Sequence, residues 1–217
     1  MSKFIIWGAT GQAIVLEELL SSQKSKIVAL FDNNSALTSP FRYIPIFYGK
    51  EGFEDWLFKK GTNETLNFLV AIGGTDGKSR AHIFQYLESK GLTPQTVIHP
   101  NAFVAYNAHL GRGCQILSQS SICAKVILGD SVIINTGASV DHETIVGDFV
   151  HIAPNATICG AVNIGKQTFI GANATIISGI KIGENSIIGA GSIVTRNIPN
   201  NVVAYGNPAR VIKTIAY

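Results

Sequence analysis

Residues 134–158 read INTGASVDHETIVGDFVHIAPNATI and carry an aliphatic residue at every sixth position. The same spacing continues in both directions without a change of register, and every position is Ile, Leu or Val. The positions are Ile98, Val104, Leu110, Ile116, Ile122, Leu128, Ile134, Val140, Val146, Ile152, Ile158, Ile164, Ile170, Ile176, Ile182, Ile188 and Val194. A hexapeptide period predicts a parallel β-helix, in which three hexads form one triangular coil and residues eighteen apart stack.

A second position in each hexad supports this prediction. Four residues after the aliphatic, the side chain is mostly small or β-branched, as at Ala102, Ala108, Cys114, Ser120, Ala138, Thr144, Ala156, Ala174 and Ser192. One large and one small inward side chain per hexad fit a narrow interior. Glycine often follows the aliphatic residue, where it suits a tight corner.

Strand and helix signals alternate in the first part of the chain. KFIIWGATGQAIVLEELL (3–20) predicts a buried strand, a glycine-rich turn and a helix, and KIVALFDNN (26–34) and LNFLVAIGG (66–74) predict two further strands. DGKSRAHIFQYLESKG (76–91) predicts a second helix. Such alternation predicts an α/β, Rossmann-like βαβ domain with a parallel sheet. We expect this domain over 1–93, the β-helix over 94–198 and a C-terminal cap over 199–217.

The glycine-rich turn is a candidate nucleotide site. Ligands bind at the carboxyl ends of parallel strands, where Gly8, Thr10 and Gly11 offer helix-N-terminal amides to a phosphate. Asp32 follows at about the distance at which an acidic residue reaches a ribose hydroxyl. The turn is GATGQA, with Ala13 in place of a third glycine, and the domain is short. A mononucleotide or nucleotide-linked ligand is therefore favoured over a full dinucleotide; the alternative is an ordinary tight turn in a packing domain.

The composition argues against several classes of protein. The net charge is only +3 and no Lys/Arg run stands out, so a nucleic-acid-binding stripe is not expected. No apolar run suits a signal peptide or a membrane span. Cys114, Cys123 and Cys159 have neither CxxC nor conventional zinc spacing. We expect a cytoplasmic protein without a metal centre.

The two halves together resemble a known family. The resemblance covers essentially the whole chain and shows in GATGQA, FDNN, VIHPNA, NTGASVDHETIVGDFVHIAPNATICG, IGAGSIV and YGNPAR. It is to the NeuD/PglD-type sugar acetyltransferases, which include nucleotide-aminosugar N-acetyltransferases and sialic-acid O-acetyltransferases. It implies a left-handed parallel β-helix, acetyl-CoA as acetyl donor, and a homotrimer with active sites between subunits.

The resemblance also implies roles for individual residues. His142 matches the catalytic histidine, Glu143 the acidic neighbour that raises its basicity, and Asn135 precedes that histidine at the usual interval. His151 matches the histidine that contacts acetyl-CoA. Further cofactor contacts are expected at Gly160, Ala172, Ala190 and Asn207, and nucleotide-sugar contacts at Gly8, Thr10, Gly11, Gln12, Asp32, Asn33 and Gly73. Gln12 stands where many members carry a histidine, and glutamine cannot shuttle a proton.

The chemistry of acyl transfer fits these residue types. An amine must be neutral to attack a thioester, and an imidazole is suited to take its proton. A carboxylate on the other ring nitrogen favours the imidazolium that forms; both Asp141 and Glu143 are candidates. His142 and His151 should face outward on successive hexads, so they can line one groove. No residue implies a covalent acyl-enzyme, so direct transfer is expected.

Arg210 is a candidate for the phosphates of coenzyme A, or part of a segment that covers the end of the solenoid. Two other functions remain open. A zinc hydratase of the γ-carbonic anhydrase type would need about three ligands, of which His142 and His151 offer two. A non-catalytic nucleotide-sugar-binding module would keep the Gly8–Gly11 turn without coenzyme A. Within the leading reading, N-acetylation of an aminosugar is favoured over O-acetylation of a sialic acid.

Overall fold

The computed structural model describes residues 2–61 and 66–215. Parts of the expected first domain (1 and 62–65) and of the expected cap (216–217) lie outside the described residues. The chain forms two compact units: one comprises the residues up to Ile72 together with Ser79–Gln95, and the other comprises Gly73–Lys78 and the chain from Thr96 onward. The residues 2–61 and 66–215 contain no helix that is long and apolar enough to cross a membrane.

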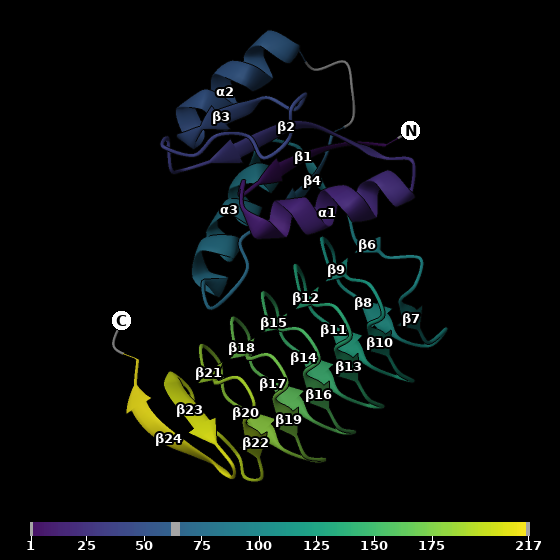
Figure 1. Cartoon of the computed structure of the whole chain (residues 1–217), viewed down its shortest axis with the longest axis vertical. Coiled ribbons are helices and arrows are strands. Elements are labelled where there is room, and N and C mark those ends of the chain that lie inside the picture. The colour runs from purple at the N-terminus through teal and green to yellow at the C-terminus, as the bar shows by residue number, and fades with distance from the viewer. Residues whose placement is uncertain (1, 62–65, 216–217) are drawn as a thin grey trace. The chain divides into compact units, whose positions relative to one another are not determined.

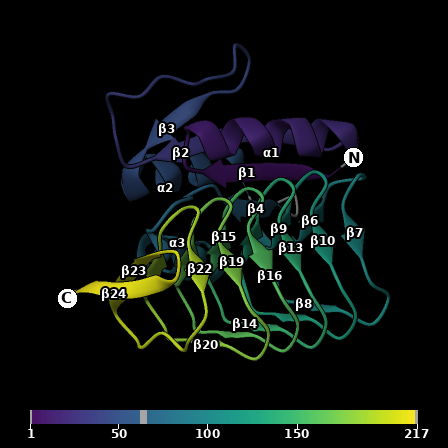
Figure 2. The same cartoon turned by 60° about the horizontal axis from the view of Figure 1, so that its bottom comes forward.

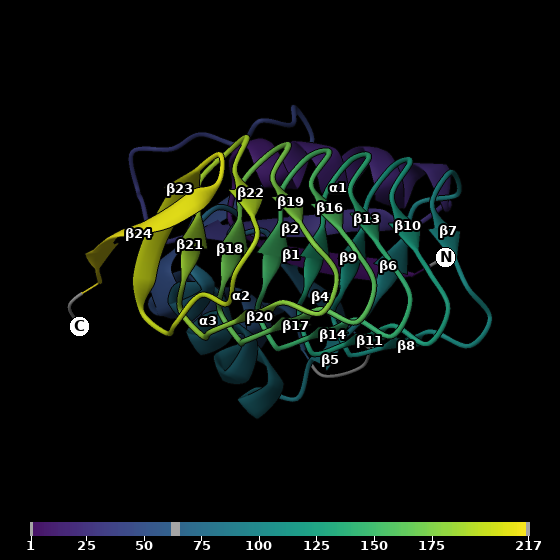
Figure 3. The same ribbon diagram turned by 90° about the horizontal axis from the view of Figure 1, so that it is seen from below.

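The first unit contains a five-stranded parallel sheet in the order β3-β2-β1-β4-β5; Figure 1 labels β1 to β4, and Figure 3 also labels β5. The strands are β1 (Lys3–Trp7), β2 (Lys26–Asp32), β3 (Ile46–Tyr48), β4 (Asn67–Val70) and β5 (Thr93–Pro94). The helices are α1 (Gly11–Ser22), α2 (Gly49–Lys60) and α3 (Gly77–Ser89). The expected Rossmann-like α/β arrangement is confirmed, while β3, α2 and β5 were not anticipated.

Aromatic side chains pack α2, which the sequence patterns did not predict, against the sheet. The Phe31 ring lies 5.7 Å from Trp7 and 5.1 Å from Phe53, a fully buried residue of α2. Glu51 in the first turn of α2 and Lys59 in its last turn have the signs that the helix dipole favours. The contact of Phe53 with the aromatic side chains of the sheet therefore holds α2 in place. The helix has too few apolar residues to show a clear helical periodicity in the sequence.

The second unit is the predicted left-handed parallel β-helix, with two-residue strands on three faces (Figures 2 and 3). Face 1 holds β6 (Val97–Ile98), β9 (Gln115–Ile116), β12 (Ile133–Ile134), β15 (His151–Ile152), β18 (Phe169–Ile170) and β21 (Ile187–Ile188). Face 2 holds β7 (Phe103–Val104), β10 (Ser121–Ile122), β13 (Ser139–Val140), β16 (Thr157–Ile158), β19 (Thr175–Ile176) and β22 (Ile193–Val194). Face 3 holds β8 (His109–Leu110), β11 (Ile127–Leu128), β14 (Ile145–Val146), β17 (Asn163–Ile164) and β20 (Lys181–Ile182).

The six-residue register is confirmed throughout the coil. Each aliphatic of the series is the last residue of its strand, and strands pair in parallel with the strand eighteen residues on, as Val140 does with Ile158. These aliphatic side chains and the small apolar side chains four positions after them form one continuous core. Inward hydroxyls bond to the main chain; Thr144 Oγ1, for example, donates to the Cys159 carbonyl oxygen at 3.1 Å.

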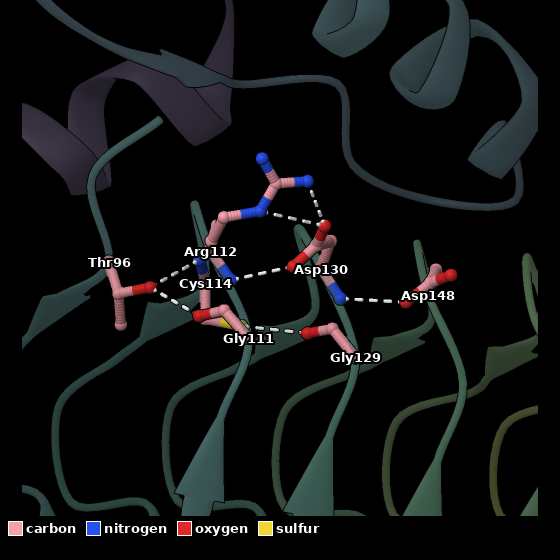
Figure 4. A network of polar contacts seen from close by, with 7 residues as sticks. All are labelled: Thr96, Gly111, Arg112, Cys114, Gly129, Asp130 and Asp148. Carbon is pink, nitrogen blue, oxygen red and sulfur yellow. Dashed lines mark hydrogen bonds and ion pairs between the residues drawn. The ribbon is translucent and has the colours of Figure 1, made fainter. Parts of the chain in front are cut away.

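Polar ladders tie the corners between faces 3 and 1, as Figure 4 shows. The Asp130 carboxylate accepts the Arg112 backbone N–H at 2.8 Å, and the Asp130 N–H donates to the Asp148 carboxylate at 2.8 Å. The Cys114 thiol at the same edge donates to the Gly129 carbonyl at 3.1 Å. Burial raises the pKa of Cys114 to about 12, so this thiol stays protonated in the folded protein.

The last strands continue face 1. β23 (Val202–Gly206) pairs in parallel with β21 and antiparallel with β24 (Ala209–Thr214). The side chains of Val202, Ala204 and Ala209 join the core of the coil. The hairpin therefore covers the apolar end that the last coil would otherwise leave open.

Candidate active site

His142 lies at an exposed corner of the coil, between β13 on face 2 and β14 on face 3. The Asp141 carboxylate accepts the backbone N–H of His142 at 2.7 Å. Glu143 Oε2 lies 3.4 Å from His142 Nδ1, and the Glu143 backbone has a left-handed φ of 58°. Of the two carboxylates that the sequence left open, Glu143 is therefore the one that faces the imidazole, while Asp141 holds the main chain.

Two further residues of neighbouring coils surround this pair. Lys125, eighteen residues before Glu143, places Nζ 3.6 Å from Glu143 Oε1. Gly160, eighteen residues after His142, lies directly against the imidazole. Sequence reasoning did not include Lys125, although the eighteen-residue stacking rule would have found it.

His151 is buried, with only 5% of its surface exposed. Its ring leaves the coil on face 1, but the segment Gly73–Lys78 covers it, and the Gly74 backbone N–H donates to His151 Nδ1 at 2.8 Å. Phe169 contacts the ring edge-on, with centroids 5.3 Å apart. The ring thus faces outward from the coil, as expected, and is buried beneath a covering segment.

Asn135 lies beside His151, with its Nδ2 3.1 Å from His151 Nε2. Within a single chain, His142 and His151 do not line one groove. Successive hexads run along successive faces, so His142 lies at the corner between faces 2 and 3 whereas His151 lies on face 1. One chain therefore does not bring these two histidines together.

The remaining cofactor candidates lie on face 1 or at the corner that follows it. Ala172 and Ala190 occupy that corner on adjacent coils, where the Gly191 N–H donates to the Ala172 carbonyl at 2.8 Å. Asn207 lies in the turn of the β23–β24 hairpin, and Arg210 is exposed on β24. These residues share no corner with His142.

The nucleotide candidates of the first unit gather at the carboxyl ends of β1 and β2. Gly8 has a φ of 108°, and a Cβ there would lie 2.6 Å from the Ala71 carbonyl oxygen, so only glycine fits. Asp32 accepts the Ala9 N–H at 2.9 Å and the Asn34 N–H at 2.9 Å. Asp32 therefore holds the glycine-rich turn in place.

Other candidates of that group differ in their placement. Thr10 and Gly11 are exposed at the start of α1, Gln12 is half-buried in its first turn, and Asn33 is exposed after β2. Gly73 belongs to the second unit, with the segment that covers His151. Within residues 2–61 and 66–215, no three His, Cys, Asp or Glu side chains form a group suited to a metal ion.

Known proteins resemble this chain in both fold and sequence. A family profile described as the hexapeptide repeat of succinyl-transferase matches residues 161–196. A search of curated proteins gave no match. WeeI from Acinetobacter baumannii is 24% identical over 98% of this chain and 100% of that chain, with a TM-score of 0.79, and shows the fold.

Two solved acetyltransferases are more similar in sequence. The acetyltransferase domain of PglB from Neisseria gonorrhoeae is 27% identical, covers 98% of this chain and 100% of its own, and has a TM-score of 0.86. A histidine-to-asparagine variant of perosamine N-acetyltransferase from Caulobacter crescentus, in complex with CoA and GDP-perosamine, is 30% identical over 98% of both chains, with a TM-score of 0.89. This identity over nearly the full length shows that the protein belongs to the NeuD/PglD-type sugar acetyltransferases, an acetyl-CoA-dependent enzyme family built on hexapeptide repeats.

Proposed function

We propose that this protein transfers the acetyl group of acetyl-CoA to the amino group of a nucleotide-linked aminosugar, such as a UDP-, GDP- or dTDP-linked 4-amino sugar used for surface glycans. The observation that carries the proposal is the His142–Glu143 pair, an imidazole and a carboxylate 3.4 Å apart at an exposed corner. The full-length similarity to an enzyme that N-acetylates perosamine, solved with GDP-perosamine, supports the amine as acceptor.

In the proposed reaction, His142 acts as general base. The neutral amine nitrogen attacks the thioester carbonyl carbon, and the new C–N bond forms as the carbonyl becomes an oxyanion. His142 Nε2 accepts the amine proton, while Nδ1 faces Glu143, whose negative charge stabilises the imidazolium. Collapse of the tetrahedral intermediate breaks the C–S bond, and the imidazolium returns the proton to the coenzyme A thiolate. No step needs a covalent acyl-enzyme.

In this proposal, the glycine-rich turn binds the nucleotide part of the substrate. Thr10 and Gly11 present main-chain N–H groups at the start of α1, where an anion is favoured, and Gly8 shapes the turn that leads to them. Each Asp32 oxygen already accepts one backbone N–H and keeps a second lone pair for a ribose hydroxyl. Gln12, Asn33 and Gly73 are the further candidates for contacts to the nucleotide sugar.

Acetyl-CoA is proposed to bind between copies of the chain in a homotrimer. Its candidate contacts, His151, Gly160, Ala172, Ala190, Asn207 and Arg210, do not share one corner, and only Gly160 lies beside His142. A cofactor that touches face-1 residues and reaches His142 must therefore meet them from different copies. On face 3, beside the His142 corner, Ile127 and Ile145 are each 45% exposed, an apolar surface that a second copy would cover. The three free cysteines fit a reducing, cytoplasmic setting.

The test of the proposed base is His142→Ala. Loss of a general base lowers turnover by about 10²–10⁴-fold, whereas the dissociation constant for acetyl-CoA, measured by calorimetry, should stay within about twofold because no cofactor contact is removed. In the Caulobacter enzyme, complexes with CoA and GDP-perosamine were obtained with one histidine replaced by asparagine or alanine.

His82→Ala is the matched control, since His82 is also exposed but lies on α3, outside the coil. Its turnover should equal that of the wild type. Unchanged turnover of His142→Ala would contradict a base role for His142.

A further inference from the structure

We propose that Gly160 is a positioning residue for His142: its missing side chain leaves the space that the imidazole occupies. The inference rests on the proposed role of His142 as general base. It assigns to Gly160 a task apart from any contact with acetyl-CoA.

The stacking of the coil places Gly160 against the ring. A Cβ built on Gly160 would lie 2.4 Å from His142 Nε2, 2.5 Å from Cε1 and 3.0 Å from Cδ2. The main chain fixes this approach on both sides, because the Asp141 N–H donates to the Ile158 carbonyl at 2.9 Å and the Ala161 N–H donates to the His142 carbonyl at 2.8 Å. The two residues therefore cannot separate without breaking the ladder of the coil.

The contacts at Gly160 differ from those at structural corner glycines. A Cβ at Gly147 would lie 2.7 Å from the Lys166 backbone nitrogen, and one at Gly165 would lie 2.4 Å from the Glu184 backbone nitrogen. The coil itself excludes side chains there. At Gly160, the three nearest atoms all belong to the His142 ring, and the backbone is outside the left-handed region. The imidazole is therefore the nearest obstacle to a side chain at Gly160.

With this geometry, a methyl group at position 160 should lower the rate without destabilising the fold. The His142 side chain is 56% exposed, so its ring can swing toward water when a methyl group is added at position 160. Ordinary carbon contacts are about 3.5 Å or longer, so the ring must move by roughly 1 Å. The movement takes Nε2 away from the place it holds over Gly160 and disturbs the approach of Nδ1 to Glu143. A misplacement of this size costs on the order of 10² in rate.

The experiment is a double-mutant cycle of Gly160→Ala and His142→Ala, with kcat, both KM values and thermal stability measured for each variant. We expect Gly160→Ala to lower kcat by about 10², with the melting temperature nearly unchanged. In the His142→Ala background, the same methyl group should change kcat by less than about twofold, since no ring remains to be displaced. Gly52→Ala is the control for a methyl group as such, because its Cβ would lie 3.5 Å from Phe47 Cβ, an ordinary contact.

Equal losses in both backgrounds would show that Gly160 acts through acetyl-CoA or the fold and would overturn the inference, as would full activity of Gly160→Ala. If His142→Ala alone leaves kcat unchanged, the proposed base fails instead. A second measurement does not depend on turnover: a nuclear Overhauser contact between a Gly160 α-proton and His142 Hε1 is expected in the wild type. Its absence would also overturn the inference.

Discussion

The carboxylate beside His142 offers the most quantitative prediction. Glu143→Gln removes the negative charge but keeps the shape of the side chain and its capacity to accept a hydrogen bond. In a water-like dielectric, two unit charges 3.4 Å apart attract by roughly 1.2 kcal/mol. The water value applies because both side chains are more than half exposed, at 56% and 55%. The imidazolium that forms in the transition state loses this attraction, so kcat should fall by about eightfold.

The assay is release of the coenzyme A thiol at saturating acetyl-CoA and aminosugar, followed with a thiol reagent. Asp141→Asn is the matched control, because asparagine still presents an oxygen to the His142 backbone N–H; its kcat should stay within about twofold. Salt provides a second check. At 1 M ionic strength the screening length is about 3 Å, so the difference between wild type and Glu143→Gln should shrink.

A larger loss from Asp141→Asn than from Glu143→Gln would refute this reasoning, since it would make Asp141 the partner of the ring. A loss for Glu143→Gln that did not respond to salt would refute the electrostatic origin of the effect.

Three further predictions concern the scaffold. Gly8→Ala should destabilise the first unit by about 3 kcal/mol in urea titrations followed by tryptophan fluorescence, because a strained φ and the Ala71 carbonyl both oppose a side chain; Gly11→Ala, with open space around it, should shift stability little, and equal effects would contradict the account. The Cys114 thiol should resist maleimide until the protein unfolds. Since its pKa is raised by burial to about 12 from an ordinary 9.0, the unfolded state loses its proton first. Cys114 should therefore lower stability by up to about 1.4 kcal/mol per pH unit between those values, a contribution that Cys114→Ala should lack. Ile158→Ala should cost about 2–5 kcal/mol by circular dichroism, because the residue is fully buried in the coil; a loss below 1 kcal/mol would show that the core collapses around the cavity.

The β-helix could be predicted in detail because equivalent positions in successive hexads have the same structural environment. A residue's place in the hexad decides whether it points inward, and a step of eighteen residues gives its neighbour on the next coil. The same rule leads from His142 to Gly160 and from Glu143 to Lys125, two contacts that could have been found from the sequence. Choosing Glu143 over Asp141 required the corner geometry, in particular the distance from Glu143 Oε2 to His142 Nδ1 and the hydrogen bond from the His142 N–H to Asp141.

Long-range packing accounts for what the sequence did not reveal. His151 is covered by Gly74, which lies 77 residues earlier in the chain, and no local pattern links the two. The short strand Ile46–Tyr48 follows an irregular loop and pairs with β2 over only a few residues. Helix α2 buries one residue fully, Phe53, and so lacks an apolar period. Each of these features depends on contacts between segments rather than on periodicity.

The most direct test of the central claim, acetylation of an amine on a nucleotide-linked sugar, is coenzyme A release over a panel of acceptors. The panel holds UDP-, GDP- and dTDP-linked 4-amino sugars, the same nucleotide sugars with a hydroxyl in place of the amine, and free sialic acid. We predict release with at least one nucleotide-linked aminosugar and none with its hydroxyl counterpart or with sialic acid. Release with sialic acid alone, or with hydroxyl and amino sugars alike, would contradict the account.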